Sequence, residues 1–414
     1  MSVASSSAGL RGWTAVALLG VGAFSVVTTE LAPIGMLSGI AGDLAQTPGR
    51  AGLVVTAYAW IGAIAALFAV LTLSAMPRRP LLVVLLLLLA LSNGVAALST
   101  TFSILLMARL VGALAHGAFW AMVGTLGAQL VPARQVGLAT AIIFGGVSVA
   151  SVLGVPMVNV ISSHGSWRTA FACLGILSLA TGIALAGLLP RMAGTAPLQR
   201  AQFLVVVRNA GLRRLYVIAA GAIIAHFAAF TYVEVLLSSR LHVSTAWVAV
   251  CLFAFGAAGL VGNLLCGALI DRHLKGMLAT ALFVMALCLL VIGMGCADGV
   301  TMAILLVLGW GLGVAVLFVG IQAWVIRLAG DAALPASAIY AAIFNGAVGT
   351  GALVGSGMLD RWGAGTLCLA SAAVMLFSFT LVYRLQATHV PSDTMLAGNT
   401  KGITADYKPA DSGR

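Results

Sequence analysis

Residues 102–130 read FSILLMARLVGALAHGAFWAMVGTLGAQL, an apolar stretch with an arginine and a histidine in its middle. A stretch of this length is enough to span a membrane as one α-helix. At about 1.5 Å per residue, Arg109 lies about 10 Å and His116 about 20 Å into it. A cation at such a depth costs at least about 2.5–3.5 kcal/mol, so it normally faces a bundle interior or an aqueous cavity. Arg109, His116 and Trp120 are seven and four residues apart, which predicts one helical face lining a polar passage.

The composition of the whole chain indicates a polytopic membrane protein. Hydrophobic residues make up 62% of the 414 residues and charged residues 7%, and the mean hydropathy is +1.13. A soluble domain does not sustain such values over this length. The six cysteines stand singly in apolar runs without metal-ligand spacing, so neither a metal site nor a disulfide framework is expected.

Twelve apolar windows of about 20 residues can be placed along the chain. They are 13–37, 51–74, 81–98, 102–130, 136–161, 168–189, 212–237, 245–270, 277–296, 301–326, 335–359 and 364–383. The predicted fold is therefore all-α, with twelve transmembrane helices in two six-helix repeats. The expected domains are a cytoplasmic N-terminus (1–12), a first bundle (13–189), a cytoplasmic linker (190–211), a second bundle (212–384) and a disordered cytoplasmic tail (385–414).

The distribution of basic residues predicts the orientation. With the N-terminus inside, sixteen of the 21 Lys and Arg residues fall on the cytoplasmic side and four on the other. This bias places both termini in the cytoplasm. The net charge of +11 is spread between apolar spans instead of forming one patch, so no nucleic-acid partner is expected. The arginine-rich linker is either a solvated connection or, around 198–208, an amphipathic helix lying on anionic lipid.

The two halves resemble each other at corresponding places. Helix 1 ends in FSVVTTE and helix 7 contains FAAFTYVE, so Glu30 and Glu234 occupy similar positions. The connections HGSWRTAF and LDRWGAGT also correspond. Parallel six-helix repeats are a recurrent construction of transporters, which hold substrate between the halves near the membrane midplane.

Several motifs resemble those of the major facilitator superfamily over residues 13–384. The loop signature GxLxDR matches Gly267, Leu269, Asp271 and Arg272, and the WRxxF signature matches Trp167, Arg168 and Phe171. Arg109 matches the arginine of helix 4. The first-half GxLxDR loop keeps only Arg78 and Arg79, and the antiporter motif of helix 5 is present loosely as GGVSVASVLGVP. We expect Gly145, Gly146 and Gly154, with Pro156, of that motif to contact a second-half helix closely.

Within this superfamily the segments TTELAPIGML, AYAW, RLVGALAHGAFW and QAWVIRLA are similar to the bacterial proton-coupled efflux branch, which includes sugar-efflux and arabinose-type exporters. The resemblance implies a monomeric antiporter of the bacterial inner membrane, surrounded by lipid and driven by the proton gradient without a cofactor. Its substrates would be small polar solutes, sugars first. Export of drugs, nucleosides or amino-acid derivatives is the alternative. A membrane-embedded enzyme would need convergent nucleophiles or metal ligands, and the sequence offers none.

Four residues are candidates for proton coupling: Glu30, Arg109, His116 and Glu234. Glu30 and Arg109 lie at similar depth on antiparallel helices and could form an ion pair, either a permanent structural one or one that releases the carboxylate to take a proton. Histidine titrates near neutral pH, so His116 could carry a proton or donate to a substrate hydroxyl.

The candidates for substrate binding are polar or aromatic residues at depth within the predicted spans. They are His116, Trp120, Asn345, Tyr58, Trp60, Gln322 and Trp324. An amide in the middle of a span either bonds a neighbouring helix or a ligand. Flat aromatic faces beside amides suit sugar rings, although aromatic residues also anchor helices at the membrane interface.

Overall fold

The computed structural model describes residues 9–73, 75–123, 126–132, 135–194 and 200–385. All regular elements in these ranges are helices. Ten candidate membrane spans occur among them, and the last, Gly299–Arg384, runs through a 3-10 turn at Gly330–Ala332 and a break at Gly363. Its three helical stretches correspond to the last three windows expected from the sequence. The chain is thus an all-α polytopic membrane protein.

In its described residues the first half contains ten α-helices and short 3-10 and π-helical turns. They are α1 (Leu10–Leu31), α2 (Leu37–Asp43), α3 (Pro48–Ala51), α4 (Leu53–Thr72), α5 (Arg78–Ala97), α6 (Phe102–Val123), α7 (Gly127–Leu130), α8 (Val136–Val149), α9 (Val155–His164) and α10 (Trp167–Leu188), with a 3-10 turn at Ala32–Gly35 and a π-helical turn at Ala150–Gly154.

The linker and the second half contain six α-helices, of which two are long because helices merge across kinks. They are α11 (Arg200–Arg208), α12 (Ala210–Phe230), α13 (Val233–Arg240), α14 (Thr245–Met294), α15 (Gly299–Ala329) and α16 (Ala333–Arg384). The linker thus contains a helix, α11, which exposes Leu204, Val205 and Val207. These exposed apolar side chains fit the amphipathic alternative of the sequence, while Leu198 lies outside the described residues.

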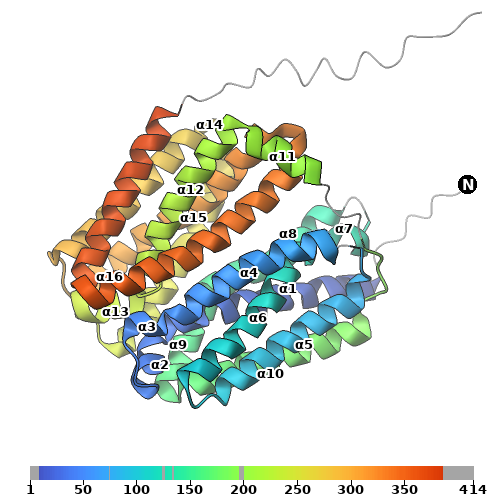
Figure 1. Ribbon diagram of the computed structural model, residues 1–414, viewed down its shortest axis with the longest axis horizontal. Helices are drawn as coiled ribbons and strands as arrows, with labels where there is room; N and C mark the ends of the chain where they lie inside the picture. Colours follow the sequence, from blue (N-terminus) through green and yellow to red (C-terminus); the bar gives the residue numbers. More distant parts are fainter. Residues whose placement is uncertain (1–8, 74, 124–125, 133–134, 195–199, 386–414) are drawn as a thin grey trace, which may run out of the picture.

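The halves form two bundles that meet at one end (Figure 1). At that end α13 lies against α2, and α16 lies against α3 and α4. We call it the outer end and call the opposite end, with α11, the inner end. One hydrophobic core joins outer residues of the first half, such as Ile34 and Leu37, to the second half, including Val233 and Leu236. A separate core fills the inner part of the first bundle. The halves therefore share a core at the outer end.

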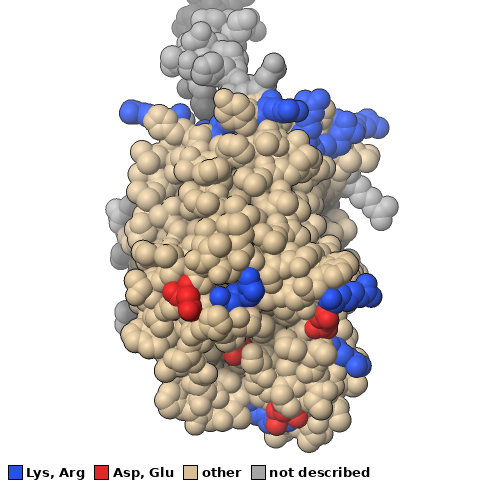
Figure 2. Space-filling view, turned by 90° about the vertical axis from the view of Figure 1, so that its left-hand side faces the viewer, with Lys and Arg blue, Asp and Glu red and all other residues tan. Residues whose placement is uncertain are grey.

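Charged side chains divide along the molecule. Figure 2 shows Lys and Arg without acidic neighbours along the upper edge, beside the grey segment, whereas acidic side chains appear lower down, close to arginines. The asymmetry of Lys and Arg along the sequence is therefore also an asymmetry of the folded surface.

Candidate functional site

Close packing of α4 against α6 builds the centre of the first bundle. A Cβ atom on Gly117 would lie 2.2 Å from the carbonyl oxygen of Gly62, so a glycine at this position lets the two backbones touch. The same approach brings the rings of Tyr58 and His116 to 5.3 Å between centroids, edge to face. Trp120, one turn further along α6, lies 6.4 Å from the ring of His116. The polar face expected on residues 102–130 therefore packs against α4.

Arg109 is fully buried and binds the end of α1. Its Nη1 donates to the carbonyl oxygen of Thr29 at 2.8 Å, and its Nη2 donates to that of Glu30 at 3.1 Å. The carbonyl of Thr29 has no intrahelical donor because the residue four positions later, Pro33, lacks an N–H. The guanidinium also lies 3.9 Å over the ring of Tyr58. Arg109 thus fixes α1, α4 and α6 relative to one another.

The carboxylate of Glu30 has a different partner from the one expected. Its Oε2 lies 3.7 Å from Nε2 of His116, and the side chains are 14% and 3% exposed. The ion pairs among the described residues do not join Glu30 to Arg109. The expected pair is corrected, because the two terminal nitrogens of Arg109 are already bound to main-chain carbonyls. Glu30 and His116 instead form an acid–imidazole pair. A proton on His116 would strengthen their attraction, and a proton on Glu30 would abolish it.

Several buried polar atoms in the same bundle have no partner. Buried side-chain atoms of the first bundle without a hydrogen-bond partner include Thr28 Oγ1, Thr56 Oγ1, Tyr58 Oη, Asn93 Oδ1, Arg109 Nε and His116 Nδ1. Each such atom costs about 1–3 kcal/mol when left unpaired. A polar region of this kind suits water or a polar ligand that supplies the missing partners.

The other candidate residues lie elsewhere. Nε1 of Trp60 donates across the junction of the halves to the carbonyl of Gly346 at 3.2 Å and to Oγ1 of Thr350 at 3.3 Å. Gln322 donates to Ser337 at 2.8 Å within the second half, and Trp324 is buried in the second-half core.

Asn345 and Glu234 are placed differently again. Nδ2 of Asn345 donates to the carbonyl of Ala341, one turn earlier in the same helix, at 2.9 Å. Glu234 does not join the Glu30 group, because it lies in α13 at the outer end and accepts a hydrogen bond from the backbone N–H of Ser38 at 3.2 Å.

The antiporter-like motif contacts both its own half and the second half. A Cβ on Gly154 would lie 2.6 Å from Oγ1 of Thr28, so this glycine packs on α1 of its own half. Pro156 is buried at the start of α9. The contact with the second half comes from Ser151 and Val152 of the π-helical turn, which lie against Gly256. The motif thus reaches a second-half helix through Ser151 and Val152, whereas Gly146 and Gly154 pack on α1.

The loop motifs have separate structural positions. Arg78 is buried and donates to the sulfur of Met122, while Arg79 donates to the carbonyl of Ala186. In the second half, Gly267 and Arg272 are exposed in α14. The side chain of Asp271 lies outside the described part, so the GxLxDR contacts stay a prediction.

The WRxxF motif joins three outer loops. Arg168 donates to the carboxylate of Asp43 and, at 3.0 and 2.8 Å, to the carbonyl of Ser99. The indole of Trp167 donates to the same carboxylate at 3.2 Å. The hydrogen bond from Arg168 holds the pKa of Asp43 below its usual range. Phe171 is buried with its ring 5.7 Å from the guanidinium of Arg109, so this residue of the motif packs beside the site.

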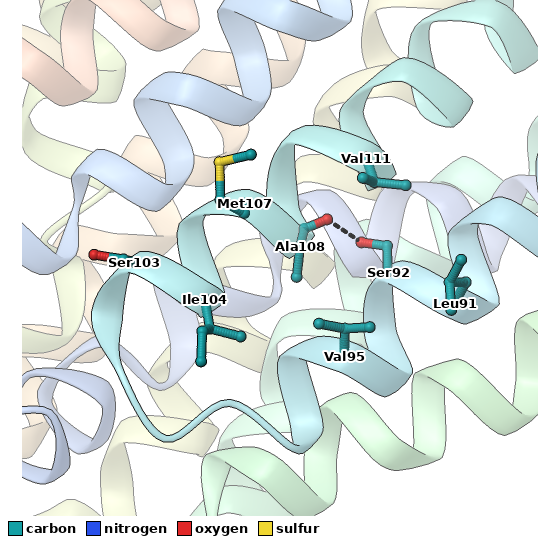
Figure 3. Close-up of a pocket in the computed structure, with 8 residues that line it drawn as sticks. All are labelled: Leu91, Ser92, Val95, Ser103, Ile104, Met107, Ala108 and Val111. Carbon is teal, nitrogen blue, oxygen red and sulfur yellow. Dashed lines mark hydrogen bonds between the residues drawn. The ribbon is translucent and has the colours of Figure 1, made fainter.

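A groove of about 400 Å³ lies between α5 and α6 but is not part of this site. Figure 3 shows that apolar side chains line it and that Ser92 donates to the carbonyl of Ala108 across it, at 2.7 Å. Leu91 and Met107, which line it, are exposed on the outer surface of the bundle. The groove is therefore an apolar surface feature that suits lipid chains and not a polar solute.

Two bundles of apolar helices that share one outer junction and enclose polar side chains at depth define a transporter-type membrane protein. The chain belongs to the major facilitator superfamily, whose family model matches residues 18–334. It is therefore a membrane transporter and not an enzyme.

Solved structures share this fold at low sequence identity. The human organic anion transporter MFSD10 (TETRAN) is 18% identical with a TM-score of 0.65, over 90% of this chain and 99% of that one. The nucleoside transporter NupG is 13% identical with a TM-score of 0.71, over 89% and 98%. A POT family transporter in complex with 5-aminolevulinic acid is 12% identical with a TM-score of 0.73, over 90% and 95%. At these identities the likeness concerns the fold.

Proposed function

We propose that this chain is a proton-driven antiporter that exports small polar solutes, sugars first, across a bacterial inner membrane by alternating access. In this proposal it works as a monomer with both termini in the cytoplasm. The proton gradient supplies the energy, and no cofactor is needed. The observation that supports it is the carboxylate of Glu30 held 3.7 Å from the imidazole of His116 inside an apolar bundle. Ionisable side chains at that depth raise the free energy of the folded protein and usually mark a transport pathway.

The geometry suggests how proton and solute compete. The guanidinium of Arg109 stays bound to the carbonyls of Thr29 and Glu30, so it supplies a fixed positive charge beside the pair. While unprotonated, the carboxylate of Glu30 and the imidazole of His116 can accept hydrogen bonds from ligand hydroxyls, and a proton on either group removes an acceptor. Proton binding and solute binding then alternate on the same two side chains.

A polar solute would satisfy groups that the folded chain leaves unpaired. Oη of Tyr58 and Nδ1 of His116 are buried without partners. On the second half, Asn345 donates to Ala341 through its amide nitrogen, and its Oδ1 can accept a hydrogen bond from a ligand. A solute with several hydroxyl groups can supply both donors and acceptors to such a set.

Drug export is the second candidate, because the second half carries a large aromatic cluster. His226 is its centre, and its ring lies 4.8–6.3 Å from those of five neighbours: Phe227, Phe230, Phe255, Trp310 and Phe318. Phe255 and Phe318 are partly exposed and could stack on an aromatic ligand. The unpaired polar atoms of the first bundle favour the polar solute over the drug.

A transport panel tests the proposal. The purified full chain would be placed in liposomes with an acidic interior, and uptake of radiolabelled sugars, a nucleoside, an amino-acid derivative and chloramphenicol would be measured. An antiporter lets protons leave as solute enters, so we expect a sugar to accumulate and a protonophore to abolish the accumulation. Accumulation with an alkaline interior would indicate symport and contradict the proposal, and uptake of chloramphenicol alone would favour drug export.

We predict that His116 and Asn345 bind one solute from opposite halves. His116→Ala and Asn345→Ala should each weaken binding about tenfold or more, because each removes a hydrogen bond from a buried ligand. The double variant should lose less than the product of the two effects, because both residues contact one ligand. Calorimetry on the four proteins, with the solute that the panel identifies, measures this. Wild-type affinity in both single variants would show that His116 and Asn345 do not bind the solute.

A further inference from the structure

Most of the hydrogen bonds that join the two halves, among the described residues, are made by one loop. Six such bonds occur between described residues, and the first-half partners in all six lie between Ser38 and Trp60. Four of the six reach the segment of α2 and α3 that connects the first two spans. Side chains of the second half supply the partners: Glu234, Asp360 and Tyr232.

Asp360 binds the start of α3. Its Oδ2 accepts from the hydroxyl of Thr47 at 2.8 Å, and its Oδ1 accepts from the backbone N–H of Gly49 at 3.3 Å. A Cβ on Gly49 would lie 2.4–2.5 Å from the carboxylate atoms, so glycine is needed for this approach. Both halves thus contribute to one contact: α16 supplies the carboxylate, and the glycine of α3 leaves room for it.

Two further contacts flank this one. Oε2 of Glu234 accepts from the N–H of Ser38 in α2 at 3.2 Å. The hydroxyl of Tyr232 is shared between the carbonyl of Ala352 in its own half, at 2.8 Å, and that of Gly49, at 3.4 Å. A Cβ on Gly52 would lie 2.1 Å from this hydroxyl, so a second glycine makes room for the second half.

Helices α4 and α16 lie further apart toward the inner end. Trp60 of α4 contacts α16, and residues that continue its helical face inward are exposed: Ile64 by 63%, Phe68 by 60% and Leu71 by 45%. The two bundles in Figure 1 likewise meet beside α3 and α13 and diverge away from them. The contacts on residues 38–52 therefore close the outer side in a conformation whose inner side is separated.

We propose that Asp360 and Glu234, assisted by Tyr232, form the outer gate of the transport cycle. They are positioning residues: their hydrogen bonds to the loop 38–52 hold the halves together at the outer end, and all of them break when that end opens. The ion pairs among the described residues include neither carboxylate. The gate is thus built from hydrogen bonds to N–H and O–H groups, which water can replace as the halves separate.

Distance measurements test the gate without substrate or gradient. Spin labels would be attached at Ser163→Cys in α9 and Ser239→Cys in α13, two exposed residues near the outer ends of opposite halves. The exposed native cysteines, Cys173 and Cys296, would be replaced by serine. Double electron–electron resonance in lipid nanodiscs then gives the distance distribution between the labels, and from it the outer-closed and outer-open populations. We expect Asp360→Ala and Glu234→Ala each to raise the ratio of open to closed about tenfold, because each removes hydrogen bonds to a carboxylate.

Matched variants separate the gate from general damage. Gly49→Ala, on the opposite half, should reproduce the effect of Asp360→Ala, and the double variant should not exceed either, because both break one contact. Asp298→Ala is the control: this exposed outer carboxylate pairs with His242 of its own half at 3.0 Å and should leave the distances unchanged. Unchanged distances in a folded Asp360→Ala and Glu234→Ala double variant would overturn the proposal, as would an equal shift in Asp298→Ala.

Discussion

Glu30→Gln should abolish accumulation of solute against its gradient while leaving exchange of labelled for unlabelled solute measurable. Glutamine keeps the shape of the side chain and a polar oxygen facing Nε2 of His116, which lies 3.7 Å from the carboxylate in the native protein. It cannot take up or release a proton near neutral pH. The solute site would therefore survive while its link to the proton gradient is cut.

Proteoliposomes with an imposed pH gradient give the accumulation, and the same vesicles without a gradient give the exchange rate. We expect accumulation to fall at least about a hundredfold, since uncoupling removes the driving force entirely, and exchange to stay within about tenfold of the wild type, the cost of one weakened hydrogen bond. Asp43→Asn serves as control, because that carboxylate lies outside the site and binds Arg168. Normal accumulation by Glu30→Gln would move the proton site elsewhere, with His116 as the next candidate.

The fold could be predicted from sequence because its main determinants are local. Twenty-residue apolar windows and the spacing of basic residues are visible without any tertiary information. The polar face of α6 was also predictable from helical periodicity. What periodicity could not give was the partner of each polar group, since that depends on how helices far apart in sequence approach one another.

The partner of Arg109 shows what was missed. Its depth suggested an ion pair with Glu30, yet it binds the carbonyls of Thr29 and Glu30. The signal was present in the sequence, because Pro33 lies four residues after Thr29 and leaves that carbonyl without its helical donor. An arginine at the same depth is then a natural donor to the helix end.

The internal repeat misled the interpretation of Glu234. The segments FSVVTTE and FAAFTYVE suggested equivalent acids. In the structure α12 ends at Phe230 and Tyr232 leaves helical geometry, with φ of −109° and ψ of 19°. The chain then continues as α13, which takes Glu234 to the outer junction. Contacts across that junction, including those of Trp60 and Asp360, join residues about 200–310 positions apart and leave no local pattern.

Arg109→Lys should strongly reduce both driven transport and exchange, unlike Glu30→Gln. The guanidinium binds two carbonyls while lying 3.9 Å over the ring of Tyr58. An ammonium is a single, strongly hydrated charge without the planar fork, so it cannot keep both hydrogen bonds and the stacked position. At least one buried carbonyl would lose its donor, at a cost of about 1–3 kcal/mol. The end of α1, and with it the carboxylate of Glu30, would no longer be held against His116.

The measurement pairs exchange rates with thermal unfolding in detergent. We expect exchange to fall about tenfold to a hundredfold, in line with the lost hydrogen bonding, and the unfolding temperature to fall by a few degrees. Arg168→Lys is the matched control, because its side chain is 30% exposed and binds loop groups outside the polar centre; water can replace what the lysine does not reach, so exchange should persist. Wild-type exchange in Arg109→Lys would show that the position of α1 does not depend on the paired carbonyl contacts. Loss of exchange in both variants would assign the effect to any arginine-to-lysine change instead of to the geometry around Thr29.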